Sequence, residues 1–221
     1  MSNYRYFVFF HLNKNIKKIN GKHLIYYPFN AAKKSKFIDK IYLNTDTERI
    51  IKIARSYKIK NIFKREKKLG GNKVKIHEVL INQIKKLSLD STFDFMILLE
   101  PTSPLTTYKD IDKAIKKIID NKFSSLISIS SESIPNLNYE VLLYKNKIKF
   151  KNKDLIKLQN RQNFEKKYFA CGTLYITKIK SYFKYKNFLQ DKTGFIEVDK
   201  NKMFEIDDEI DFKIVKMLLE N

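Results

Sequence analysis

The stretch FDFMILLEPTSPLT, residues 93–106, joins a strand signal to a loop signal. Its first half is apolar apart from Asp94 and has the length of a buried strand. Two prolines then bracket Thr102 and Ser103, which restricts the backbone of the following loop. Directly afterwards, Thr107 and Asp110 stand at the spacing of a capping box that opens a helix. The stretch predicts a strand–loop–helix unit with a rigid, hydroxyl-bearing loop. An ordinary strand-to-helix turn is the alternative.

Apolar runs alternate with helical patterns on both sides of this unit. The expected strands are residues 4–10, 40–44, 93–99 and 126–130, and the expected helices are 24–36, 47–57, 73–87 and 107–121. This order is typical of an α/β fold with a mostly parallel sheet flanked by helices. Such a sheet binds its ligands at the carboxyl ends of its strands. We therefore expect the site in the loops at residues 11–14, 45–46 and 100–106.

The alternation changes after residue 130. Residues 139–151 have the pattern of an antiparallel hairpin, and residues 173–177 that of a further strand. A C-terminal helix is expected to begin near Asp207 and to run through Leu219. The sequence thus predicts a single domain over residues 1–221, with a small antiparallel arm at about 134–167.

The composition favours a soluble, cytoplasmic protein. Hydrophobic residues make up 43% of the 221 residues, which suffices for a core, and no apolar run reaches the length of a membrane span. The N-terminus lacks the zones of a signal peptide. The single cysteine, Cys171, suits a reducing compartment. No membrane partner is expected.

The formal net charge of +21 has two interpretations. It is compatible with a nucleic-acid-binding module, whose basic residues cluster on one face. Here the lysines are spread along the whole chain and acidic residues are interleaved. We therefore favour a general surface bias and expect no nucleic-acid partner. A positive field would still attract an anionic substrate such as a nucleoside triphosphate.

The segment LLEPTSPLT, residues 98–106, resembles LLQPTSPLR of the acylneuraminate cytidylyltransferases, the CMP-sialic acid synthetases and related CMP-nonulosonate synthetases. Other segments resemble family motifs in the same order along essentially the whole chain. They are KNI and GKHLI (14–16, 21–25), NTDTE (44–48), Arg65 with Leu69 and Gly71, the spaced residues Arg161, Gln162, Tyr168, Gly172 and Tyr175, and EIDDEIDF (205–212). Each motif alone is weakly specific, but their common order is not expected by chance.

The resemblance implies a Rossmann-like nucleotide-diphospho-sugar transferase fold and a reaction. In that reaction, a hydroxyl of an acidic nine-carbon sugar (a sialic, legionaminic or pseudaminic type of nonulosonic acid) attacks the α-phosphate of CTP. Pyrophosphate leaves, and the CMP-sugar serves surface polysaccharide synthesis. The resemblance also implies Mg²⁺ as cofactor and a homodimer in which the arm completes the partner's sugar site.

Glu205 and Asp207 match the metal-binding acidic pair of the family. In an extended segment, residues two apart project to the same side, so both carboxylates can reach one ion. Carboxylate oxygens are suitable ligands for Mg²⁺. For Asp207, capping of the last helix is the alternative.

The resemblance assigns the remaining site residues by position. Arg65 and Arg161 each carry a guanidinium group, which can bind an oxyanion through two donors. For both residues, the alternative is a solvated surface charge. For Tyr168, the alternative role is packing. Tyr175 is also expected to be a packing residue. The candidates are Lys22 and Arg161 for catalysis, His11, Lys14, Asn15 and Arg65 for the nucleotide, and Glu100, Thr102, Ser103 and Tyr168 for the sugar.

The chain departs from the family pattern before Lys14. Family members carry an Arg and a Gly-Ser-Lys loop there, whereas this strand runs through His11 almost directly to Lys14 and Asn15. His11 stands where the arginine would be, and burial is its alternative role. The shorter loop keeps a second function open, that of a catalytically weak or inactive relative binding a nucleotide, a sugar or a protein.

Three single positions also differ from the family. Glu100 replaces a glutamine, Thr106 an arginine and Cys171 an asparagine. Glu100 thus presents a carboxylate where an anionic sugar would approach. Cys171 has no histidine near it in sequence and is expected to be a small buried residue.

Overall fold

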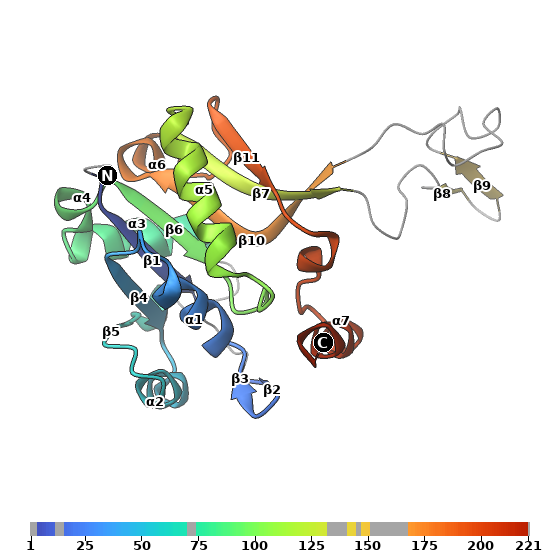
Figure 1. Ribbon diagram of the computed structural model, residues 1–221, viewed down its shortest axis with the longest axis horizontal. Helices are drawn as coiled ribbons and strands as arrows, with labels where there is room; N and C mark the ends of the chain where they lie inside the picture. The colour runs from blue at the N-terminus through green and yellow to red at the C-terminus, as the bar shows by residue number, and fades with distance from the viewer. Residues whose placement is uncertain are drawn as a thin grey trace.

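The computed structural model describes residues 4–11, 16–69, 74–131, 141–144, 147–150 and 168–220. Figure 1 shows the arrangement of the elements. The strands are β1 (Tyr6–His11), β2 (Lys18–Ile19), β3 (Lys22–His23), β4 (Lys40–Thr45), β5 (Asn61–Lys64), β6 (Phe95–Leu99), β7 (Ser125–Ser131), β8 (Val141–Tyr144), β9 (Lys147–Phe150), β10 (Tyr168–Lys178) and β11 (Thr193–Glu197). The helices are α1 (Tyr26–Lys34), α2 (Glu48–Ser56), α3 (Ile76–Lys86), α4 (Leu89–Thr92), α5 (Tyr108–Asp120), α6 (Ile179–Tyr185) and α7 (Glu209–Glu220), with 3-10 turns at Lys67–Leu69 and Lys200–Met203.

The central sheet has seven strands in the order β11-β7-β10-β6-β1-β4-β5. β1 pairs in parallel with β4 and β6, β4 with β5, and β7 with β11. β10 is the exception, because it lies antiparallel between β6 and β7. The predicted α/β class with a mostly parallel sheet is confirmed.

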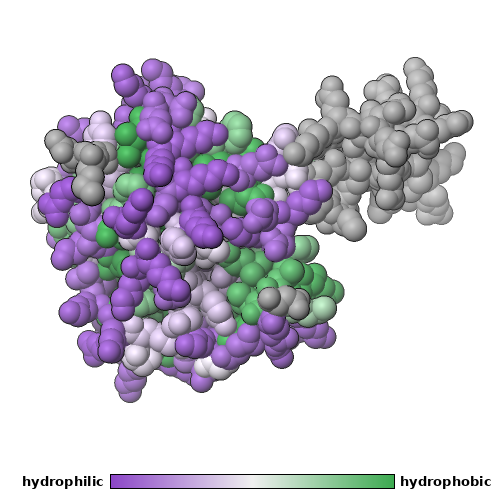
Figure 2. Space-filling model, in the orientation of Figure 1, coloured by the Kyte–Doolittle hydropathy of each residue, from purple (hydrophilic) through white to green (hydrophobic). Residues whose placement is uncertain are grey.

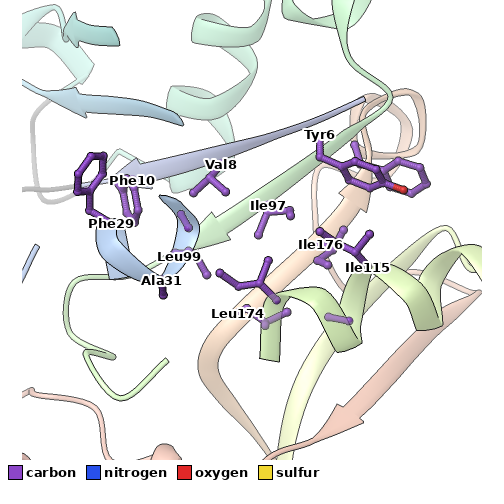
Figure 3. Close-up of a cluster of buried hydrophobic side chains, with 14 of the residues drawn as sticks. Tyr6, Val8, Phe10, Phe29, Ala31, Ile97, Leu99, Ile115, Leu174 and Ile176 are labelled. Atoms are coloured by element: carbon purple, nitrogen blue, oxygen red, sulfur yellow. The ribbon is translucent and has the colours of Figure 1, made fainter. Parts of the chain in front are cut away.

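The apolar run of β1 divides between the two faces of the sheet. Tyr6, Val8 and Phe10 belong to one buried cluster, and Phe7 and Phe9 belong to the other. The cause is the alternation of side chains along a strand, which gives a fully covered strand an uninterrupted apolar sequence. Figure 3 shows part of the first cluster, where side chains of β1 and β6 meet those of β10 and α5.

Helices cover both faces of the sheet. α1, α2 and α5 contribute buried residues to the cluster of Tyr6, and α3, α4 and α6 contribute to the cluster of Phe7. The helices α1, α2, α3 and α5 were expected from their periodicity. The strands β5 and β11 and the helix α6 were not. Within the described ranges, no helix is long and apolar enough to cross a membrane.

A third, smaller cluster joins the β2–β3 hairpin to α7. Ile19 and Leu24 pack there with Ile206 and Val215. An ion pair of 2.7 Å between Lys17 Nζ and Glu209 Oε2 reinforces the contact. Figure 1 shows the hairpin beside α7, away from the main sheet.

The predicted arm at about 134–167 is only partly described. β8 and β9 pair as an antiparallel hairpin, as the sequence indicated. The rest of the arm lies outside the described residues.

The predicted capping box at the start of α5 is confirmed. The Thr107 side chain accepts a hydrogen bond from the Asp110 N–H, and the Asp110 carboxylate accepts one from the Thr107 N–H at 2.9 Å. The Lys202 ammonium also donates to both carboxylate oxygens of Asp110, each at 2.8 Å. This box therefore anchors the segment that follows β11 as well as the helix.

Replacing Thr107 with Ala is expected to lower the free energy of unfolding by about 1 kcal/mol, because one N-terminal amide of α5 loses its acceptor. Thr47→Ala is a matched control. Thr47 occupies the same position before α2 but makes no capping hydrogen bond. Urea denaturation measures both changes. Equal losses for the two variants would contradict the role of the box.

Candidate active site

The loop after β6 meets the bulged part of β10 at the carboxyl edge of the parallel strands. Tyr175 of β10 lies opposite Leu98 of β6. Because the two strands are antiparallel, the residues before Tyr175 extend past the end of β6, alongside the loop that begins at Glu100.

Side-chain and backbone hydrogen bonds fasten this loop to its neighbours. The Thr106 hydroxyl donates to the Thr173 carbonyl of β10 at 2.9 Å. The Ile206 N–H donates to the Thr102 carbonyl at 2.8 Å. The loop 100–106 is therefore held both to β10 and to the segment that carries the acidic pair.

Glu205 lies half-buried against β10. The Gly172 N–H donates a hydrogen bond to its carboxylate. A Cβ added at Gly172 would lie 2.5 Å from both carboxylate oxygens. Only a glycine leaves this carboxylate in its present place.

Three carboxylates gather around this point. Burial first, and then the neighbouring Glu205 and Asp207, raise the pKa of Glu100, against a hydrogen bond from Thr102. Burial likewise raises the pKa of Glu205, assisted by Asp207 and opposed by the Gly172 N–H. Mutual repulsion and burial thus disfavour the charged forms, which is the setting that a bound cation relieves.

Tyr175 stands next to the same carboxylates. Burial, followed by Glu205 and Glu100, raises the pKa of its phenol to about 12. Its ring also packs on Phe188, with 5.4 Å between ring centroids. Tyr175 was expected to be a packing residue. It does pack on Phe188, but it also lies beside the carboxylates. Its place in the motif that also contains Arg161 and Gly172 was the sequence signal that could have identified it.

The cap of α7 is formed by Asp208, not by Asp207. Asp208 Oδ1 accepts hydrogen bonds from the N–H groups of Ile210 at 2.7 Å and Asp211 at 2.9 Å. Asp207 is exposed, and its own N–H donates to Asp211 Oδ2 at 3.1 Å. The capping alternative for Asp207 is therefore wrong, and its carboxylate is not engaged in the cap.

The donor set fits a hard divalent cation. In the part of the chain that the structure describes, no group of three or more His, Cys, Asp or Glu side chains forms a ready-made metal centre. Mg²⁺ commonly takes only one or two carboxylates and completes its shell with substrate phosphates and water. Glu205 and Asp207 meet that requirement.

A second charged feature lies at the ends of β4 and β5. The Arg65 side chain is only 1% exposed, and its guanidinium pairs with Asp46 Oδ1 at 3.2 Å. Its backbone N–H donates to the Thr45 carbonyl at 2.9 Å. Solvated surface charge, the alternative role for Arg65, is therefore wrong.

The other candidates fall at different places. Lys22 is exposed on β3, with its ammonium 4.1 Å from the Tyr26 ring centroid, and the structure does not bring it to the carboxylates. Ser103 is buried in the loop after β6, and its hydroxyl has no hydrogen-bond partner among the described residues. Tyr168 is 46% exposed at the start of β10. Lys14, Asn15 and Arg161, and the side chain of His11, lie outside what is described.

Solved structures show what class of domain this arrangement belongs to. A CMP:2-keto-3-deoxy-manno-octonic acid synthetase complexed with CTP matches with a TM-score of 0.72 and 11% identity over 98% of each chain. A 4-diphosphocytidyl-2C-methyl-D-erythritol synthase from Anaerococcus prevotii matches with a TM-score of 0.68 and 15% identity, over 99% of this chain and 97% of that one. The fold is that of the nucleotidyltransferases.

The chain belongs to the cytidylyltransferase family, because the family model described as Cytidylyltransferase matches residues 12–221. Among its relatives, the post-translational flagellin modification protein B of Campylobacter coli is 30% identical over 94% of this chain and 88% of its own length. The CMP-N,N'-diacetyllegionaminic acid synthase of Campylobacter jejuni is 29% identical, with the same coverage of both chains. The pseudaminic acid cytidylyltransferase of Campylobacter jejuni is 26% identical over 93% of this chain and 88% of its own. The expected family is confirmed.

Replacing Glu100 with Gln is expected to stabilise the fold at neutral pH. The pKa of Glu100 is raised above its ordinary value of 4.5, so the folded state holds this proton more tightly than the unfolded state. Stability therefore falls as the pH rises from the ordinary pKa through the raised one. Glu100→Gln has no ionisable group at this position and should not lose stability as the pH rises. Its higher free energy of unfolding relative to wild type should therefore disappear in acid. Urea denaturation from pH 4 to 8 without divalent metal measures it.

Glu209→Gln provides a control of opposite sign. Lys17 lowers the pKa of Glu209 by a hydrogen bond and by its charge, so this pair stabilises the fold above the ordinary pKa. That variant should lose stability as the pH rises. A pH-independent difference between wild type and Glu100→Gln would refute the buried, carboxylate-crowded site.

Proposed function

We propose that this cytidylyltransferase transfers CMP from CTP to an acidic nine-carbon sugar of the nonulosonic acid class, with release of pyrophosphate. The observation that carries the proposal is the pair of hydrogen bonds that joins Glu205 to the Gly172 N–H and the Ile206 N–H to the Thr102 carbonyl, where the loop after β6 meets β10. Burial, and then the charges of Glu205 and Asp207, also raise the pKa of Glu100 in that loop. The names of the relatives, which include legionaminic and pseudaminic acid enzymes, support the sugar class.

In this reaction, a sugar hydroxyl oxygen forms a bond to the α-phosphorus of CTP. The bond from that phosphorus to the oxygen bridging to the β-phosphate breaks, and pyrophosphate leaves. The hydroxyl proton passes to solvent or to a neighbouring base. Catalysis of such a transfer consists mainly of placing the reactants and stabilising charge on the phosphates.

Glu205 and Asp207 are proposed to hold Mg²⁺, which would neutralise charge on the phosphate oxygens. Supporting this assignment, the Asp207 carboxylate is exposed and takes no part in the cap of α7. The Gly172 N–H fixes one oxygen of Glu205 and leaves the other for the ion.

The sugar is proposed to lie along the loop after β6. Thr102 and Ser103 would offer hydroxyls there, and the buried Ser103 hydroxyl has no partner among the described residues. Glu100 would accept hydrogen bonds from sugar hydroxyls. Tyr168 remains a proposed sugar contact from the resemblance alone.

The nucleotide assignments are also proposals. Arg65 is supported by its buried position at the carboxyl edge of the sheet, where its charge is partly balanced by Asp46. His11, Lys14 and Asn15 for the nucleotide, and Lys22 and Arg161 for catalysis, are supported by the resemblance in sequence.

Asp207→Ala is expected to reduce pyrophosphate release to background while leaving the fold intact. The assay contains CTP, Mg²⁺ and a nonulosonic acid, and omission of any one should stop release by the wild type. Asp208→Ala is the matched control, since it removes the cap of α7 and should lower stability while keeping turnover. Full turnover by Asp207→Ala would remove Asp207 from the metal site. No release by the wild type across a panel of nonulosonic acids, with no CTP binding in calorimetry, would reject the function.

We also propose that residues 1–221 form one domain, that the arm at about 134–167 reaches a second copy, and that the protein is a cytoplasmic homodimer. The resemblance supports the dimer. An exposed apolar surface on α7 is compatible with it, since Ile210 is 67% and Met217 65% exposed. Figure 2 shows this hydrophobic area where α7 lies. The buried lone thiol of Cys171 suits a reducing compartment.

Sedimentation at micromolar concentration is expected to give the mass of a dimer. A monomer under these conditions would contradict the proposed assembly.

A further inference from the structure

β10 changes its register against β7 at one place. Cys171 lies opposite Ser128, yet Tyr175 lies opposite Ile127, the very next residue of β7. Residues 172–174 of β10 therefore have no partner in the ladder. Such a bulge leaves backbone N–H and C=O groups that need other hydrogen bonds.

The hydroxyl of Ser128 supplies these bonds on the inner side of the bulge. It donates to the Cys171 carbonyl at 2.6 Å and accepts from the Leu174 N–H at 3.1 Å. Ser128 is fully buried, with 0% exposure. One side chain thus closes the two ends of the bulge.

The other side of the bulge faces the segment that carries Lys202 and Glu205. The Gly172 N–H is free to leave the ladder and donates to Glu205. The Thr173 hydroxyl donates to the Lys202 carbonyl at 3.1 Å, and Thr106 donates to the Thr173 carbonyl at 2.9 Å. Gly172 and Thr173 therefore hold the loop 100–106 and the segment 202–205 against the bulge.

We propose that Ser128 and Gly172 are positioning residues that orient the Glu205 carboxylate for a divalent cation, with the β10 bulge as the rigid connection between them. This inference rests on the proposed function, because it takes Glu205 as a metal ligand. Neither residue is assigned a contact with substrate. Ser128 fixes the bulge, the bulge directs the Gly172 N–H outward, and that N–H holds one carboxylate oxygen.

The spatial fit at Gly172 makes the inference testable. Gly172 does not have a positive φ, so alanine is not strained there by its backbone. The three atoms nearest to its methyl all belong to the end of the Glu205 side chain, which is flexible. Gly172→Ala should therefore fold and move the carboxylate. Ser128→Ala acts from the β7 side of the bulge, because it removes the hydroxyl that bonds the Cys171 carbonyl and the Leu174 N–H.

The experiment measures Mn²⁺ binding to the full chain in the presence of CTP and without sugar, from the electron paramagnetic resonance signal of free Mn²⁺. Mutation of a residue that hydrogen-bonds a metal ligand typically weakens metal affinity by about 10- to 100-fold. Gly172→Ala and Ser128→Ala are each expected to raise the dissociation constant for Mn²⁺ by about tenfold or more. Glu205→Gln gives the reference for loss of the ligand itself.

Ser125→Ala is the matched control. Ser125 lies on the same strand, is equally buried, and bonds to Thr193 Oγ1 at 2.7 Å, away from the bulge. It should leave Mn²⁺ affinity unchanged. Thermal unfolding of each variant shows whether it folds, and if Ser128→Ala does not, Gly172→Ala decides the outcome.

The variants distinguish failure of this inference from failure of the proposed function. Wild-type affinity for Mn²⁺ in the folded Gly172→Ala variant would overturn the inference while leaving the proposed function intact. A wild-type chain that binds no Mn²⁺ with CTP and releases no pyrophosphate would overturn the proposed function, and this inference with it. An equal loss of affinity in Ser125→Ala would also overturn it, because the effect would then be a general one of β7.

Discussion

The antiparallel insertion of β10 between β6 and β7 is the constraint on which the rest of the site depends. In a sheet whose other neighbours run in parallel, loops that follow strands gather at one edge. β10 runs the other way, so the residues that precede its regular part reach this same edge. The loop after β6 and the segment before α7 are both fastened to those residues by hydrogen bonds. Segments separated by about a hundred residues in sequence meet there because one strand is reversed.

Much of the fold follows from local patterns. The apolar runs that became β1 and β6 lie buried on both sides, and the Thr107–Asp110 capping box opens α5 as its spacing indicated. The strand β10 was expected only as a short segment, and nothing in its residues indicates its direction, because pairing is decided by distant partners. β11 was missed because its sequence, TGFIE, is short and alternates in burial at the sheet edge, with Phe195 half exposed.

The site could be predicted from sequence only in part. The acidic pair Glu205 and Asp207 was found through its resemblance, but two consecutive aspartates fit a helix cap equally well, and only geometry assigns the cap to Asp208. The same limit applies to Arg65, since burial of a lone arginine against Asp46 has no local signature. The role of the Gly172 backbone was invisible too, because it arises from a register change between strands.

The separate small cluster of the hairpin and α7 has a consequence for local stability. Its buried members are few, and its ion pair joins residues 192 positions apart in the chain at an exposed site. Regions with little buried apolar surface open at lower free energy than the core around them. α7 can therefore detach by fluctuation while the seven-stranded sheet stays folded. Asp207 lies next to this helix, whereas the Gly172 N–H of β10 holds Glu205. The two carboxylates therefore belong to regions that open with different free energies.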